Sequence, residues 1–279
     1  MSDAAKEPPT GRGVMLLGAP ITYIPIWAAV IVVLGLIPLS PVVGGGGFFT
    51  LSMAVSPLVG VALGPWAGAL TALIGGYISM AVAPYGAILG PLEPIPRALE
   101  ALVGGFIAHR RGGFTWLAAA FGPALLMVFW ASFPVVGMEF PRCPLPPPLS
   151  VLSPYAGFLF GVTHVWPSWI LLLAMSRRVR EWISHGDFKK LSTAMFIVTY
   201  YVSSSVGHVL GATLSLYLYR LPLVLYVYTA LTLTWAERLV IAACGAVVGA
   251  VAITALRKAG ARKPLYTICL LYTSDAADE

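Results

Sequence analysis

Apolar runs of about 20 residues, separated by short polar or Pro- and Gly-rich breaks, make up most of the chain. As an α-helix rising about 1.5 Å per residue, such a run crosses a hydrocarbon core of roughly 30 Å. The pattern predicts an all-α fold, namely a polytopic transmembrane helix bundle. We expect its helices at residues 21–39, 51–63, 66–83, 94–109, 114–133, 155–175, 191–219 and 235–256.

Two segments leave the helix count open between about six and eight. Residues 51–63 provide only roughly 20 Å of helix, and Pro57 bends that helix further. Residues 221–234 are apolar and rich in β-branched and aromatic side chains, so they are compatible with a re-entrant or interfacial piece instead of a span. Each such piece would lower the count.

Basic residues are distributed unevenly over the connections between these helices. With the N-terminus inside, the cytoplasmic segments hold 13 of the 17 Lys and Arg residues, as the positive-inside rule expects. We therefore predict that the N-terminus lies inside and that residues 1–13 form a short cytoplasmic tail. The basic residues left on the outer side are Arg97, Arg142, Arg220 and Arg238.

Composition supports the membrane class. Hydrophobic residues make up 58% of the chain and charged residues 10%, and the mean hydropathy is +0.86, too apolar for a water-soluble domain of this length. The formal charge of +6 indicates anionic lipid headgroups as partners and no nucleic acid.

Residues 269–279 read CLLYTSDAADE and look like the translation of a sequencing adapter. We expect the natural sequence to be interrupted at or before Ile268, which leaves residues 14–268 as a single transmembrane helical domain. Without the last eleven residues the formal charge is +9, and the remaining cysteines are Cys143 and Cys244. Their spacing supports neither a disulfide framework nor a metal site.

Small residues recur at every fourth position in three stripes along the chain. Such stripes allow helix backbones to approach closely, and generic helix packing accounts for them. The stripes are Gly60, Gly64, Gly68, Ala72 and Gly76; Ser203, Gly207, Gly211 and Ser215; and Gly245 and Gly249.

A charged group begins the expected helix at residues 94–109. Arg97 can pair with Glu93 four residues before it and with Glu100 three residues after it. The three residues either satisfy one another and anchor the helix, or line an outward-facing pocket for a polar ligand, next to a Pro- and Gly-rich loop that carries Tyr85. Glu237 and Arg238 lie at the same outer level, and we expect them to be interfacial anchors.

Two histidines, His164 and His208, fall at roughly the middle of the membrane. A histidine at that depth can bind a ligand, relay a proton or form a hydrogen bond to a neighbouring helix. Aromatic and hydroxyl residues suited to a flat heterocycle surround them in the sequence. These are Trp130, Trp166, Trp169, Tyr200, Tyr201 and Ser203 to Ser205.

Motifs of known enzyme classes are missing from the sequence. It holds no HExxH, GxSxG or Walker phosphate loop, and the GGGGFFT run at Gly44 to Thr50 lacks the Lys-Ser/Thr ending. We expect no enzymatic activity and no cofactor, and any use of ATP would require another chain.

Three strings carry a resemblance to a known family. They are SPLVGVALGPWAGALTALIGGYIS from Ser56, PRALEALVGGFIA from Pro96 and ERLVIAACGAVVGAVAITALRKAG from Glu237. Together with the Pro/Gly loops, they resemble the substrate-binding S components of energy-coupling-factor (ECF) vitamin transporters. The resemblance implies a multi-pass protein of a prokaryotic cell membrane that captures a vitamin-like solute from the outside. The partners it implies are a transmembrane coupling subunit and two cytoplasmic ATPases.

Our expectation is therefore a solute-binding subunit of an ECF-type importer. Two alternatives stay open: a self-contained, proton-coupled secondary transporter that uses His164 and His208, and a structural or assembly membrane protein without a small ligand. The substrate is left open. The candidate substrate-binding residues are Tyr85, Glu93, Arg97, Glu100, Trp130, His164, Trp166, Tyr200 and His208.

Overall fold

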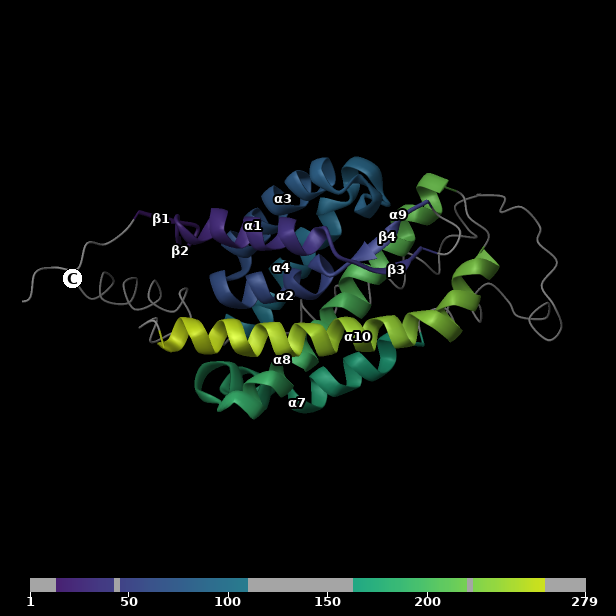
Figure 1. Cartoon of the computed structure of the whole chain (residues 1–279). Helices are drawn as coiled ribbons and strands as arrows, with labels where there is room; N and C mark the ends of the chain where they lie inside the picture. The colour runs from purple at the N-terminus through teal and green to yellow at the C-terminus, as the bar shows by residue number, and fades with distance from the viewer. Residues whose placement is uncertain (1–13, 43–45, 110–162, 220–222, 259–279) are drawn as a thin grey trace, which may run out of the picture.

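The computed structural model describes residues 14–42, 46–109, 163–219 and 223–258, and most of these residues are helical (Figure 1). Helix α8 passes through a π-helical turn, η5, into α9 without a break, so the described residues form seven helical rods. The predicted all-α helix bundle is confirmed. The helices are α1 (Tyr23–Gly35), α2 (Ser52–Leu63), α3 (Pro65–Val82), α4 (Pro94–His109), α7 (Val165–His185), α8 (Phe188–Val202), η5 (Ser203–His208), α9 (Val209–Tyr219) and α10 (Leu223–Lys258).

Short hairpins and 3-10 turns connect the first helices. An antiparallel pair, β1 (Met15–Leu16) and β2 (Ala19–Pro20), precedes α1. A second pair, β3 (Pro38–Pro41) and β4 (Phe48–Thr50), joins α1 to α2, with an irregularity in its register between Pro38 and Ser40. Two 3-10 turns, η1 (Pro84–Gly86) and η2 (Gly90–Leu92), lie between α3 and α4.

Three of the described helices are long and apolar enough to cross a membrane. They cover Pro65–Val82, Phe188–Ser215 and Leu231–Lys258, while Tyr23–Gly35 and Ser52–Leu63 are shorter apolar helices. Length and composition thus agree with the predicted membrane protein.

Helix α2 is short because protein surrounds it on every side. All of its twelve residues are buried, and it packs against α1, α3, α4, α8 and α10. A helix enclosed in this way does not have to match the thickness of the lipid, so its length of roughly 20 Å causes no mismatch. Gly64, with φ of +88°, ends α2, and Pro65 starts α3 at once. The sequence Gly64-Pro65 therefore connects the two helices with almost no loop.

Glycines bring α2, α3 and α4 into backbone contact. A Cβ on Gly60 would overlap the Ala101 carbonyl, and one on Gly105 would lie 2.5 Å from Pro65 Cα. A Cβ on Gly68 would lie 2.6 Å from Gly60 Cα. The predicted packing role of the stripe is confirmed for Gly60 and Gly68, since no larger residue fits there without movement of the backbone.

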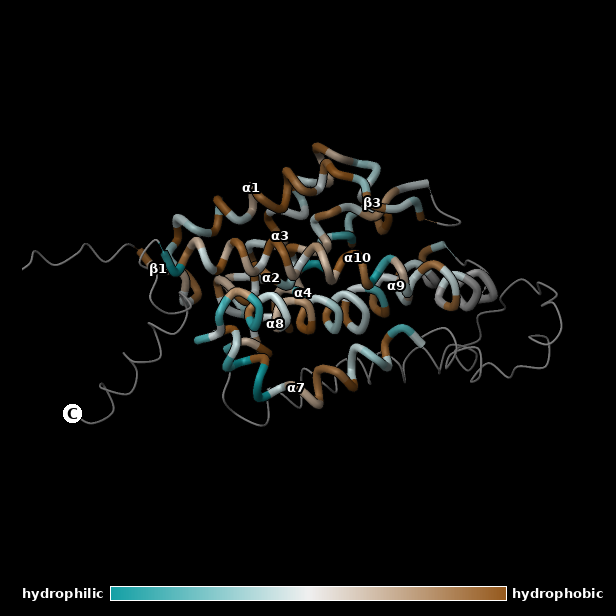
Figure 2. Tube along the Cα trace, turned by 60° about the horizontal axis from the view of Figure 1, so that its bottom comes forward, coloured by the Kyte–Doolittle hydropathy of each residue, from teal (hydrophilic) through white to brown (hydrophobic). Residues whose placement is uncertain are grey.

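The two ends of the bundle differ in character. At one end, Arg257 of α10 donates hydrogen bonds to the carbonyls of Ile183 and Gly186, where α7 turns into α8. Hydrophilic residues gather at this turn (Figure 2). The β3–β4 hairpin and α9 lie at the other end (Figure 1). Basic residues of α7, α8 and α10 therefore share one end, as the charge pattern predicts.

Three predicted boundaries are wrong. Helix α1 ends at Gly35 and not near residue 39, because Pro38 begins a strand. Helix α7 extends ten residues beyond Met175, since its arginines point away from the core and do not stop the helix. The segment at residues 221–234 is no separate piece, because α10 is one helix of 36 residues with neither Gly nor Pro in its first half. The predicted helix at residues 114–133 lies outside the described residues, as do residues 155–162 of the next predicted helix, whose described part begins only at Val165.

The substitution Gly60→Ala tests the close contact between α2 and α4. Its methyl group would meet the Ala101 carbonyl, so we expect the melting temperature of the purified protein to fall by roughly 5–10 °C. Gly211→Ala in α9 is the matched control, because a Cβ there meets nothing within 4 Å. Equal melting temperatures for the two variants would contradict the packing assigned to Gly60.

Candidate functional site

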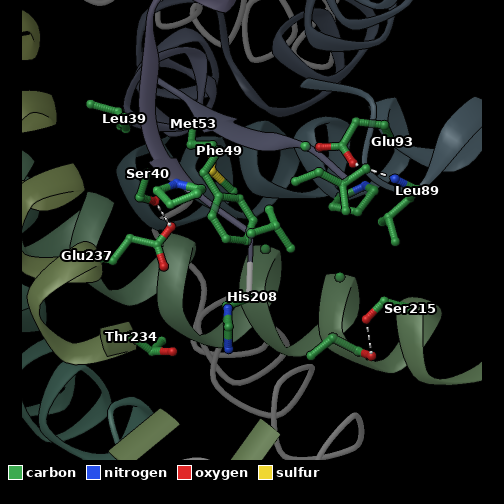
Figure 3. Close-up of a pocket in the computed structure, with 18 of the residues that line it drawn as sticks. Leu39, Ser40, Phe49, Met53, Leu89, Glu93, His208, Ser215, Thr234 and Glu237 are labelled. Carbon is green, nitrogen blue, oxygen red and sulfur yellow. Dashed lines mark hydrogen bonds between the residues drawn. The ribbon is translucent and has the colours of Figure 1, made fainter. Parts of the chain in front are cut away.

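A cavity of about 770 Å³ lies at the end of the bundle that carries the β3–β4 hairpin (Figure 3). Its walls come from the hairpin, the loop of η1 and η2, α2, the start of α4, the η5–α9 segment and the first half of α10. Phe49 of the hairpin and His208 of η5 lie on opposite walls. Segments that are far apart in the sequence therefore share one compartment.

Three side-chain hydrogen bonds hold the loops around this cavity. The Tyr85 hydroxyl donates to the Leu36 carbonyl at 2.8 Å, and the Tyr219 hydroxyl donates to the Ile88 carbonyl. Ser40 Oγ donates to Glu237 Oε1 at 3.2 Å, which ties the hairpin to α10. Side-chain hydrogen bonds thus hold the loops, and such bonds can break and form again while the helices stay folded.

Arg97 joins three elements at the cavity wall. Its Nη2 donates to Glu93 Oε1 at 3.1 Å, and its Nη1 donates to Ser52 Oγ at 3.0 Å. The other Glu93 oxygen accepts the Leu89 backbone N–H at 3.2 Å. Burial raises the pKa of the Glu93 carboxyl, while the charge of Arg97 opposes that rise. The predicted pairing of Arg97 with Glu93 is confirmed.

Glu100 lies in the same wall but makes no hydrogen bond to Arg97. Its side chain is fully buried, and neither carboxylate oxygen has a hydrogen-bond partner among the described residues. Ser56 of α2 is close to it but donates its hydrogen bond to the Ser52 carbonyl at 3.2 Å. The predicted triad of Glu93, Arg97 and Glu100 is therefore only a pair with an isolated carboxylate beside it.

Glu237 lines the cavity and pairs with Arg238, and the expectation that both are interfacial anchors is wrong for Arg238. The Arg238 side chain is fully buried, because α10 starts twelve residues before Trp235 and carries this residue into the bundle. Its Nη1 donates to the Ser203 carbonyl at 3.2 Å, its Nη2 lies 3.2 Å from Glu237 Oε1, and its guanidinium lies 5.5 Å from the centre of the Phe49 ring. The sequence signal for it was an arginine inside an apolar run.

The two histidines meet, as their depth in the sequence allows. The rings of His164 and His208 contact each other edge to face at 4.7 Å between centroids. His208 lines the cavity, whereas His164 is fully buried behind it with both ring nitrogens unpartnered among the described residues. The histidine pair thus connects the cavity to the interface of α7 and η5.

The remaining candidates are spread over different surroundings. Tyr85 lines the cavity, but Trp166 and Tyr200 do not. Trp166 packs against Trp169 with 5.8 Å between ring centroids, and the Tyr200 hydroxyl donates to the His164 carbonyl at 3.4 Å. Trp130 lies outside the described residues. Phe49 and Ser52 at the site were not among the predicted residues, because they follow a Gly run that carries no signal of its own.

Comparisons of the chain with protein-family models, with curated proteins and with solved structures found no match. Within the described ranges, no group of three or more His, Cys, Asp and Glu side chains could hold a metal ion. The function is therefore argued from the geometry of the cavity and from the sequence.

A double-variant series tests the Arg97–Glu93 pair. Arg97→Gln leaves the Glu93 carboxylate buried without its partner, which costs about 3–5 kcal/mol, so the melting temperature should fall sharply. Adding Glu93→Gln should restore part of the loss. Lys190→Gln is the control, because the Lys190–Asp187 pair is 3.9 Å long and more than half exposed, and such pairs contribute about 0–1 kcal/mol. Additive effects of the two single variants would contradict the pairing.

Proposed function

We propose that this protein is the membrane-embedded solute-binding subunit of an ECF-type importer and that it captures a vitamin-like small molecule in the cavity. The observation that carries the proposal is the cavity itself, which combines apolar walls with buried charged side chains. Its volume of about 770 Å³ falls in the range of small-molecule sites, roughly 300–1,000 Å³. The ECF resemblance of the sequence independently supports the same role.

The positions of the cavity and of the basic residues at opposite ends of the bundle support capture of the solute from outside. The cavity lies at the end opposite the basic turn between α7 and α8, and the positive-inside rule assigns that basic turn to the cytoplasm. The protein would then sit in a prokaryotic cell membrane with its cavity facing outward. Energy would come from two ATPase subunits through a transmembrane coupling subunit, since the sequence has no phosphate-binding loop.

One observation favours a second candidate, a proton-coupled secondary transporter. His208 lines the cavity and touches His164, so the two rings offer a path for a proton between the cavity and the helix interface. In this alternative the chain works without partner subunits.

A ligand screen by thermal shift tests the proposed function. A panel of vitamins and nucleobase precursors is added to the purified full chain, and one member at about 100 times its Kd should stabilise the protein by about 2.7 kcal/mol. Gly211→Phe should abolish the shift, because a side chain at that position enters the open cavity. Ile170→Phe, on an exposed face of α7, is the control and should preserve it. The absence of any stabilising panel member would contradict solute binding.

Uptake into liposomes separates the two candidates. We expect liposomes that hold this chain alone to import none of the stabilising compound under an imposed proton gradient. Import that depends on the gradient and disappears in His208→Gln would establish the secondary transporter instead. His185→Gln, at the far end of α7, is the matched control for the loss of a histidine.

A further inference from the structure

The cavity and its wall hold more carboxyl groups than guanidinium groups. Three carboxylates and two guanidiniums occupy this part of the described structure, namely Glu93, Glu100, Glu237, Arg97 and Arg238. With the histidines neutral and all three carboxyl groups ionised, one negative charge is left over. Because the Glu100 side chain is fully buried, solvent would screen its charge little.

The hydrogen-bond pattern assigns this excess to one residue. Arg97 binds Ser52 and Glu93, and Arg238 binds the Ser203 carbonyl and lies against Glu237. The carboxylates of Glu93 and Glu237 each accept a further hydrogen bond, from the Leu89 N–H and the Ser40 hydroxyl. Of the five charged groups, Glu100 alone has no partner among the described residues.

The structure makes room for the Glu100 carboxylate at the cavity wall. Its Oε1 atom rests on Gly207 so closely that a Cβ at this position would overlap it. Gly207 belongs to the π-helical turn η5, which widens the helix at this point, and such turns are frequent at functional sites. Burying an unpaired carboxylate is unfavourable in free energy. A ligand that supplies the missing partner would offset this penalty.

Apolar and aromatic side chains line much of the remaining wall, together with several hydroxyl groups. Phe49, Met53, Leu89 and Leu233 line it together with Tyr85. Aromatic faces attract cations as well as apolar ring systems. The wall therefore suits a ligand with a flat or apolar body and one charged end.

From these observations, and resting on the solute-binding function proposed above, we infer that the ligand is a monocation with a flat apolar body, such as an amidinium or a protonated amino-heterocycle. Glu100 is its specificity-determining residue, and it acts by supplying the unbalanced negative charge. Glu93 and Glu237 position the two arginines and do not bind the ligand cation.

Three probes of nearly equal shape and different charge test this inference. Benzamidine is a cation, benzamide is neutral and benzoate is an anion. Each is titrated into the full chain in detergent to about 10 mM, a concentration that fragments of ordinary efficiency require, and binding is measured by ligand-observed NMR. We expect benzamidine to bind at least about tenfold more tightly than benzamide, and benzoate not to bind.

Two pairs of variants assign the preference to Glu100. Glu100→Gln keeps the shape of the side chain and should lower benzamidine affinity about tenfold, whereas Glu181→Gln on an exposed face of α7 should not change it. Gly207→Ala should displace the Glu100 carboxylate and weaken benzamidine binding, whereas Gly211→Ala lines the same cavity and has free space for its methyl group.

The outcomes separate this inference from the function on which it rests. Equal binding of benzamidine and benzamide, preferential binding of benzoate, or no binding of benzamidine would overturn the cation preference. Unchanged affinity in both Glu100→Gln and Gly207→Ala would overturn the role of Glu100. If a vitamin or nucleobase precursor still stabilises the protein in the thermal-shift screen, the solute-binding function stands even when the cation preference fails.

Discussion

The contact of α2 with the backbones of α3 and α4 is the constraint on which the described structure depends. Helices in a membrane gain little from the hydrophobic effect, so they associate through van der Waals contact over closely fitting surfaces. The Ala101 carbonyl occupies the space that a Cβ on Gly60 would take. A Cβ on Gly104 would lie 2.8 Å from the Pro57 carbonyl. Because these contacts fix α4 against α2, Arg97 comes within 3.0 Å of the Ser52 hydroxyl at the top of α2. The glycine contacts between α2 and α4 therefore position the charged residues of the cavity wall.

The π-helical turn η5 has a corresponding effect on the other wall. It lies between α8, whose residues from Ile197 to Val202 are buried, and α9, which borders the cavity. The wider turn brings Gly207 against Glu100 and His208 into the cavity. Its first carbonyl, that of Ser203, accepts the hydrogen bond from Arg238. A regular helix would distribute these residues differently, since each added residue turns the helix face by roughly 100°.

The two ends of the helix bundle carry different features. One end has a basic turn, where Arg257 donates hydrogen bonds to the Ile183 and Gly186 carbonyls, and such a turn suits contact with anionic headgroups. The other end holds a cavity bordered by loops, and the Tyr85, Tyr219 and Ser40 hydroxyls donate hydrogen bonds that hold these loops in place. Buried charges are expensive inside a membrane, and in the described structure they are concentrated around this cavity.

The sequence by itself determined the class, the position of most helices and the pairing of Arg97 with Glu93. Apolar run length, Gly64-Pro65 and the spacing of four residues are local signals, so α2, α3 and α4 could be predicted to within a residue or two. Tertiary structure decided the isolation of Glu100, the burial of Arg238, the meeting of His164 with His208 and the position of Phe49. These features depend on how the helices pack against one another and on a π-turn that has no sequence signature. The spacing that allows Arg97 to reach Glu100 also leaves it free to bind Ser52 instead.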